Sequence, residues 1–313
     1  MPTVIEIPTV LVLGAGASNP LGFPCGEGLF LTVVEGLQDT NKELYRELVG
    51  YGFPAEKISE FHQALRKSGA NSVDEFLENR TEFLDIGKAA IARVLIPHET
   101  DVTLHDRRLV QNTGHWYYHL YEQMRAPFHR FDLNKLQVVT FNYDRSLEQF
   151  LITVLQHSHK KPLRECREQL LGIPIIHVYG KLGDLDWEDP PGRPYVPDLR
   201  WPTVSAAAQS IRIVHEVGME SEQFSDARTY LDQAERILFL GFGYSPVNLG
   251  RLKIDFRRTG RTLAGTAFQL RAAEVERIKG LCPGTKLGRS SWGVLEFLRE
   301  RVILDARREE HAS

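Results

Sequence analysis

Asn142 and Asp144 lie two residues apart in the segment TFNYD, which occupies residues 140–144. This segment follows an apolar run at residues 136–139 that predicts a buried parallel strand. In an open α/β sheet, ligands bind just beyond the carboxyl ends of the strands. A side-chain amide and a carboxylate placed there can hydrogen-bond to a sugar hydroxyl and to an amide of the ligand. Neither side chain is a strong nucleophile in this setting. The pattern favours binding and cleavage of a nucleotide glycoside over acyl transfer.

A structural role is the alternative for the same two residues. Asp144 could form an Asx-turn and cap the helix predicted over residues 146–155. This alternative accounts for Asp144 better than for Asn142, because one side chain suffices to make the cap.

Two glycine-rich turns follow other apolar runs. The segment GAGAS (residues 14–18) comes after the run at 10–13, and GFGYSPVN (241–248) comes after the run at 237–240. Glycines let the backbone approach a phosphate, and N–H groups at a helix start attract an anion. The alternative is a tight turn without a ligand. The residues expected to contact a two-ended ligand here are Gly14, Ala15, Gly16, Ser18, Gly241, Gly243, Ser245 and Asn248.

The first turn departs from the fingerprint of classical dehydrogenases. Asn19 stands where that fingerprint has its third glycine, and no acidic residue ends a second strand about twenty residues later. Hydride transfer to a nicotinamide cofactor is therefore disfavoured.

A histidine and a tyrosine occur near the end of another apolar segment, residues 174–179. Alternation along a strand would place His177 and Tyr179 on the same face. Tyr179 adjoins Gly180 at the strand end, so it is the better placed of the two to reach a ligand. The alternative for His177 is a core histidine with its hydrogen bonds satisfied.

Strands and helices alternate along most of the chain, which predicts an α/β fold with a doubly wound, mainly parallel, Rossmann-like sheet. We expect strands at residues 10–13, 136–139, 174–179, 237–240 and 262–270, and helices at 26–37, 146–155 and 221–234. Residues 41–131 have helical periodicity and are too numerous for a simple crossover, so they predict a helical insertion or cap. The proline-rich segment 184–202 predicts a loop partly covering the site, and the polar tail from Arg307 is expected to fray.

Composition restricts the class of protein. The chain has 313 residues, 42% of them hydrophobic and 25% charged, with a formal net charge of −3, so nothing in its overall charge favours nucleic-acid binding. We interpret the basic residues between 251 and 261 as a solvated helix face.

Cys25, Cys166 and Cys282 form no CxxC pair, which disfavours a structural zinc site and suits a reducing compartment. Without a leader pattern or a membrane-length apolar run, we expect a cytoplasmic protein.

The four motifs, in this order, resemble the sirtuin-like fold in its bacterial defence-associated branch. The resemblance runs from about residue 10 to about residue 270, and the combination of TFNYD with GFGY is its most specific part. It implies one NAD-binding domain over residues 1–313, with the helical insertion at about 41–131. Asn142 would hold the ribose of NAD and position a water near its anomeric carbon, and Asp144 would contact the nicotinamide amide. Gly14, Ala15, Gly16 and Ser18 would meet the diphosphate, and Gly241, Gly243, Ser245 and Asn248 the adenosine half, with Thr140 and Gly180 as further contacts.

Two departures from that family shape the expected activity. The four-cysteine zinc module of the protein deacylases is missing from the sequence, which favours NAD hydrolysis over lysine deacetylation. The family's catalytic histidine immediately precedes the glycine, where this chain has Tyr179, and His177 lies two residues earlier. A tyrosine with an unperturbed pKa near 10 is a poor base at neutral pH. The expected catalytic set is Asn142, Asp144, Tyr179 and His177.

The resemblance implies an NAD glycohydrolase that releases ADP-ribose and nicotinamide and depletes NAD in antiphage defence. It also implies a homo-oligomer controlled by a partner, with a HerA-type ATPase as the first expectation and an Argonaute-type protein as the alternative. A rival hypothesis is an NAD- or ADP-ribose-binding scaffold that regulates its partner without turnover. A third is a nuclease-associated subunit that touches nucleic acid through residues 251–261, although we do not expect direct nucleic-acid binding.

Overall fold

The computed structural model of the chain describes residues 4–213, 216–217, 221–302 and 304. The tail from Arg307, expected to fray, lies outside these residues.

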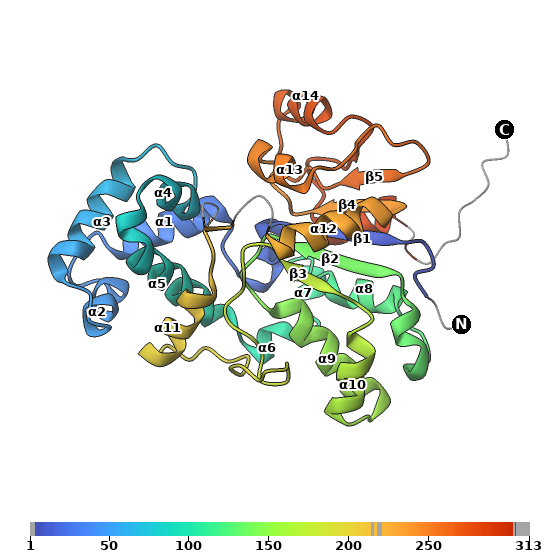
Figure 1. The fold of residues 1–313 in the computed structure, drawn as a ribbon, viewed down its shortest axis with the longest axis horizontal. Coiled ribbons are helices and arrows are strands. Elements are labelled where there is room, and N and C mark those ends of the chain that lie inside the picture. The colour runs from blue at the N-terminus through green and yellow to red at the C-terminus, as the bar shows by residue number, and fades with distance from the viewer. Residues whose placement is uncertain (1–3, 214–215, 218–220, 303, 305–313) are drawn as a thin grey trace.

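The described residues form a parallel sheet of six strands in the order β3-β2-β1-β4-β5-β6 (Figure 1). The strand order reverses between β1 and β4, as in doubly wound Rossmann-like folds. This confirms the predicted fold class. The strands are β1 (Thr9–Leu13), β2 (Leu136–Thr140), β3 (Ile175–His177), β4 (Arg236–Leu240), β5 (Thr262–Gly265) and β6 (Lys286–Leu287).

Burial explains why the central strands were the easiest to predict. Every residue of β1 and β4 is buried, because each pairs with a strand on both sides and helices lie on both sheet faces. β3 and β5 are shorter than expected, since the chain turns away at His177 and at Gly265.

The three helices predicted at residues 26–37, 146–155 and 221–234 are confirmed as α1 (Gly26–Gly36), α9 (Ser146–His159) and α12 (Glu222–Gln233). α9 and α12 flank the sheet, whereas α1 packs with helices of the 41–131 segment (Figure 1). The others beside the sheet are α10 (Leu163–Leu170), α13 (Pro246–Leu252), α14 (Ala272–Leu281) and α15 (Val294–Arg301). No helix in the described ranges is both long and apolar enough to cross a membrane.

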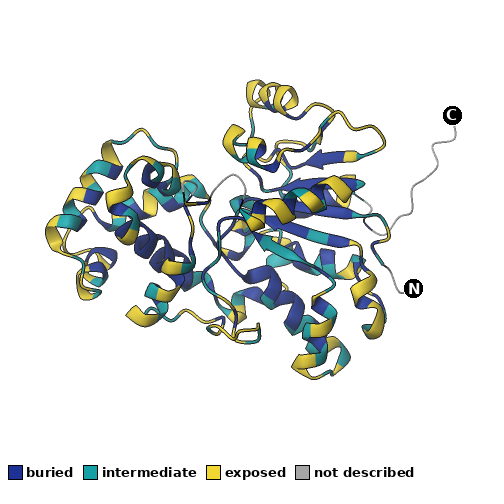
Figure 2. Cartoon of the chain, in the orientation of Figure 1, coloured by how far each residue is buried: buried dark blue, intermediate teal, exposed yellow. Residues whose placement is uncertain are grey.

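The predicted helical character of residues 41–131 is also confirmed. The helices are α2 (Glu43–Gly50), α3 (Ala55–Lys67), α4 (Val73–Asn79), α5 (Leu84–Leu95), α6 (Asp101–Leu104), α7 (Leu109–Asn112) and α8 (Tyr117–Gln123). α1 to α5 gather beside the sheet, where they are joined by α11 (Trp201–Ser210), which packs on α5 (Figure 1). α5 is almost entirely buried and forms the centre of this helical cluster (Figure 2).

Candidate functional site

The turns after β1 and β4 are in direct backbone contact. The N–H of Gly14 donates to the oxygen of Leu240 at 3.1 Å, and the N–H of Gly16 donates to the oxygen of Gly241 at 3.0 Å. Gly241 has a φ of +57°, and a Cβ built on it would lie 2.0 Å from the backbone nitrogen of Ala17. This close approach requires glycine. It also uses the N–H groups of Gly14 and Gly16 within the protein, so they are not available to a diphosphate.

The second turn is more open beyond Gly241. The N–H of Gly241 donates to Oγ1 of Thr266 at 2.9 Å. Gly243 is exposed, and apart from its own atoms and its chain neighbours no described atom lies within 4 Å of a Cβ built there. Ser245 immediately precedes α13, and its side chain makes no capping hydrogen bond. The outer part of the turn, with Asn248 in the first turn of α13, can therefore accept a ligand.

The side-chain amide of Asn142 is held in one orientation. Its Nδ2 donates to the backbone oxygen of Gly14 and to Oγ of Ser18, both at 3.0 Å, and its backbone N–H donates to Oγ1 of Thr140 at 3.1 Å. Because a backbone oxygen can only accept, the amide nitrogen must face Gly14. Asn142 is 9% exposed, and its Oδ1 has no hydrogen-bond partner among the described residues. That oxygen is the acceptor left for a ligand.

Asp144 lies on the other side of Ser18. The Ser18 hydroxyl donates to Oδ2 of Asp144 at 2.6 Å, and the N–H of Ser146 donates to Oδ1 at 3.2 Å. The second contact is the Asx-turn named above as an alternative, so Asp144 has a structural role as well as a place in the cluster. Burial raises the pKa of Asp144, and the hydrogen bonds from Ser18 and Ser146 oppose that shift.

A small cavity of about 90 Å³ brings these residues together with the helical insertion. Ser18, Asn142 and Asp144 line it, and so do Phe23 of the loop after β1 and Asp74 of α4. Asp74 was not anticipated from the sequence, where it resembles any acidic residue in the first turn of a helix. Its hydrogen bond with Tyr143 and its place in the cavity lining identify it as part of the site.

Asp74 is bound to the residue between Asn142 and Asp144. The hydroxyl of Tyr143 donates to Oδ1 of Asp74. Burial raises the pKa of Asp74, and this hydrogen bond opposes the rise. The pKa of Tyr143 lies well above its ordinary value because the ring is buried and faces the Asp74 carboxyl, so the phenol stays neutral and donates.

His177 is held away from the Asn142 cavity. Its Nδ1 lies 2.9 Å from the backbone oxygen of Asn142, and its Nε2 lies 2.6 Å from Oε1 of Glu148. Both ring nitrogens are therefore engaged within the protein. Burial alone would raise the pKa of Glu148, but the charge and hydrogen bond of His177, with help from Lys181, hold it below its ordinary value. His177 instead lines a cavity of about 630 Å³ beside β3.

Tyr179 follows the end of β3, so strand alternation with His177 does not extend to it. Its hydroxyl donates to Oδ1 of Asn248 at 2.9 Å, which joins two of the predicted site residues. Its ring packs against Phe141 and lies 5.7 Å from the guanidinium of Arg251. Burial raises the pKa of Tyr179 to about 12, although Arg251 opposes the shift. Tyr179 is therefore a neutral phenol near pH 7.

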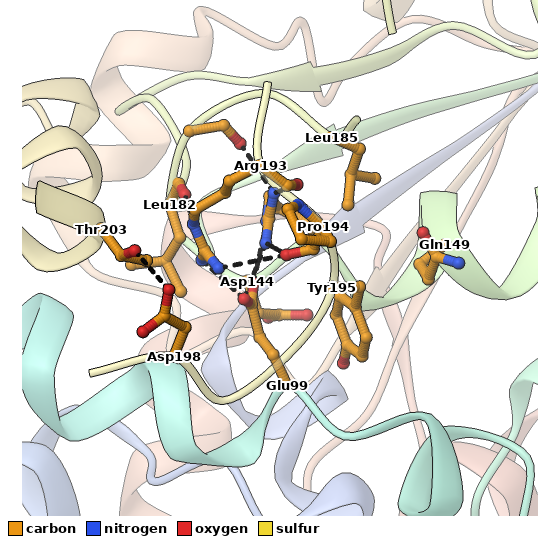
Figure 3. A network of polar contacts seen from close by, with 12 residues as sticks. Glu99, Asp144, Gln149, Leu182, Leu185, Arg193, Pro194, Tyr195, Asp198 and Thr203 are labelled. Carbon is orange, nitrogen blue, oxygen red and sulfur yellow. Dashed lines mark hydrogen bonds and ion pairs between the residues drawn. The ribbon is translucent and has the colours of Figure 1, made fainter. Parts of the chain in front are cut away.

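A buried ion-pair network fixes the residue after Asp144. Arg145 and Glu99 have fully buried side chains and form a two-point contact, Nε to Oε1 at 2.8 Å and Nη2 to Oε2 at 2.7 Å. Arg193 adds a second ion pair to Oε2 of Glu99 at 2.5 Å. Nη1 of Arg145 donates to the backbone oxygens of Asp184 and Arg193, both at 3.0 Å. Figure 3 shows this network next to Asp144, where it anchors the proline-rich loop predicted above.

The basic residues between 251 and 261 have local partners. Arg251 donates to the backbone oxygen of Val217 at 3.0 Å, and Arg261 donates to that of Ala234 at 2.9 Å. Arg258 donates to the oxygen of Asp232. These arginines thus stabilise the ends of neighbouring segments. Within the described part of the chain, no group of three or more histidine, cysteine or acidic side chains could hold a metal ion.

No protein-family model matches the sequence, and no curated protein matches it. The chemistry of the site therefore rests on its own residues and contacts.

Proposed function

We propose that the chain binds NAD at the carboxyl end of the sheet and hydrolyses its N-glycosidic bond to ADP-ribose and nicotinamide. The observation that carries this proposal is the buried Oδ1 of Asn142, which has no hydrogen-bond partner among the described residues, in a cavity that Asp144 also lines. Both side chains follow β2 and are bonded to the turn after β1, a strand that borders the point where the strand order reverses, the usual place for a nucleotide in this fold.

The reaction suits the groups present. The nicotinamide of NAD leaves as a neutral molecule from a cationic pyridinium, so it needs no general acid. The transition state resembles an oxocarbenium ion. In this proposal Oδ1 of Asn142 accepts a hydrogen bond from a ribose hydroxyl, and the carboxylate of Asp144 lies near the developing positive charge. Fixed groups of this kind stabilise a transition state without reorganising.

The loop between β1 and α1 must move for NAD to enter. The cavity of about 90 Å³ is far below the roughly 300–1,000 Å³ of typical ligand sites. Phe23 and Pro24 form one of its walls. Displacement of this loop would open the site, and its return over the bound ribose would exclude water beyond the one that reacts.

The wider role rests on the resemblance of the four motifs. In this proposal the chain is a cytoplasmic homo-oligomer that depletes NAD in antiphage defence, under the control of a HerA-type ATPase or, alternatively, an Argonaute-type protein. Control by a partner fits a reaction that would otherwise consume the NAD of its own cell.

One observation favours a second candidate, a scaffold that binds NAD or ADP-ribose without turnover. Tyr179, with a pKa raised to about 12, is bonded to Asn248, and His177 is bonded to Glu148. Neither supplies a base to the cavity that Asn142 lines.

Chromatographic detection of nicotinamide and ADP-ribose after incubation with NAD separates the two candidates. The full chain is tested alone and with the protein encoded beside it. Asn142→Ala is expected to abolish release, whereas Asn79→Ala, at an exposed position on α4, serves as the matched control and should leave it unchanged. Retained NAD binding without release in either condition would favour the scaffold.

A further inference from the structure

Asp74 is the acidic side chain that the helical insertion contributes to the Asn142 cavity. Ser72 caps α4 by accepting from the N–H of Glu75 at 3.1 Å, and Phe76 and Leu77 bury the other side of the helix. α4 is therefore fixed at its start and along its buried face. Asp74 is held by that packing and by Tyr143, so it faces the cavity in a defined position.

NAD hydrolysis needs an acceptor for the proton of the attacking water. His177 has both ring nitrogens engaged, and Tyr179 is a neutral phenol bonded to Asn248. Asp144 receives hydrogen bonds on both of its oxygens. Asp74 lines the same cavity, and among the described residues the side-chain donor bonded to it is the Tyr143 hydroxyl, at Oδ1. Its carboxylate therefore keeps lone pairs that can accept a proton.

We propose that Asp74 is the general base of the reaction and replaces the missing imidazole with a carboxylate supplied by the insertion. This inference rests on the proposed NAD hydrolysis. The bond between the ribose anomeric carbon and the pyridinium nitrogen breaks, and its electron pair stays with nicotinamide. The water oxygen bonds to the anomeric carbon, and one water proton passes to Asp74 and then to solvent. NAD⁺ and water thus give ADP-ribose, nicotinamide and a proton.

The surroundings of Asp74 suit this role. Burial raises its pKa toward the working range of a general base, and the Tyr143 hydroxyl limits the rise. Asp74 also differs from Asp144 in origin, because it belongs to the insertion and not to a strand end. Among the charged and titratable groups nearby, Asp144 lines the same cavity, and Tyr179 and Glu216 act on Tyr143. Glu216 is paired with Lys88, and Glu78 and Arg251 act on Tyr179.

The test is the pH dependence of nicotinamide release by the full chain, with NAD as substrate. Asp74→Asn is expected to lower kcat by roughly 10²–10⁴-fold, the usual contribution of a general base, with little change in KM. Asp74→Glu should restore part of the rate. Tyr143→Phe removes the hydrogen bond that opposes the raised pKa, so the acidic limb of the kcat profile should move to higher pH. Asp85→Asn, the same change at an exposed site in the insertion, should match the wild type.

The outcomes separate the two proposals. If Asp74→Asn keeps the wild-type rate and acidic limb while Asn142→Ala abolishes release, Asp74 is not the base but NAD hydrolysis stands. If the wild type binds NAD and releases no nicotinamide, alone or with its neighbour, both proposals fail. Thermal unfolding checks that Asp74→Asn is folded. If Asp74→Asn does not fold, the Tyr143→Phe variant is the test instead. An acidic limb of its kcat profile that coincides with that of the wild type then overturns the inference.

Discussion

The side-chain amide of Asn142 donates to the backbone oxygen of Gly14 at 3.0 Å and so joins the end of β2 to the end of β1. The N–H of Gly14 donates in turn to Leu240 at the end of β4. Three adjacent strands are therefore held together at the position of Asn142. Because these hydrogen bonds join the ends of the strands, the site keeps its geometry before a ligand binds.

Breaking the buried ion pair between Glu99 and Arg145 should destabilise the whole fold. Glu99→Gln leaves Arg145 and Arg193 without their shared carboxylate, and loss of one partner of a buried pair costs about 3–5 kcal/mol. Urea unfolding at neutral pH measures the loss. Glu168→Gln, which removes an exposed pair with Arg164, should change little. Equal midpoints for the two variants would contradict this prediction.

The contact between the two glycine turns predicts a contrast between neighbouring positions. Gly241→Ala should lose roughly 1–3 kcal/mol from the left-handed backbone alone, and more because its Cβ would collide with the backbone of Ala17. Gly243→Ala has open space and should be nearly neutral. Thermal unfolding of both variants gives the comparison, and a destabilised Gly243→Ala beside an unaffected Gly241→Ala would refute it.

The pair of His177 and Glu148 predicts a pH-dependent contribution to stability. Because the folded pKa of Glu148 lies below its ordinary 4.5, the contribution is complete above that value and is lost as the pH falls through the lowered pKa. Glu148→Gln should lower the free energy of unfolding by about 1.5–3 kcal/mol near neutral pH. The variant and the wild type should then converge in acid, as urea unfolding across that range would reveal. A difference that stays constant with pH would rule out the linkage.

Tyr179→Phe should affect stability more than catalysis. The phenol is neutral and bonded to Asn248, so its removal should reduce nicotinamide release far less than the roughly 10²-fold expected for a lost base. It should lower the free energy of unfolding by about 1 kcal/mol. Asn248→Ala removes the same hydrogen bond from the other side and is the matched variant. A loss in kcat of about 10²-fold or more on Tyr179→Phe would assign catalysis to the phenol.

The sheet was predictable because its central strands are continuous apolar runs that end at glycines or polar residues. β6, with only Lys286 and Leu287, is too short to give a periodic signal, and α11 starts at the end of a proline-rich segment that favours a loop. The grouping of Ser18, Asn142 and Asp144 could be expected, since adjacent parallel strands bring their carboxyl ends together.

Asp74 and Arg145 could not be recognised from the sequence. Each is a charged residue at the start of a helix, and such residues are usually solvated. Arg145 is distinguished by its ion pair with Glu99, and Asp74 by the hydrogen bond that it accepts from Tyr143. Both partners are far away along the chain. Long-range partners of this kind leave no local pattern.

The backbone contact between Gly14, Gly16 and Gly241 limits which substitutions the protein can tolerate at these positions. When two side chains collide, a second substitution can often relieve the clash by shrinking the neighbour. Here every atom that a new Cβ would meet at close range is backbone, so no neighbour can be made smaller. A library that randomises these three positions together should therefore recover glycine at all three, without compensating pairs.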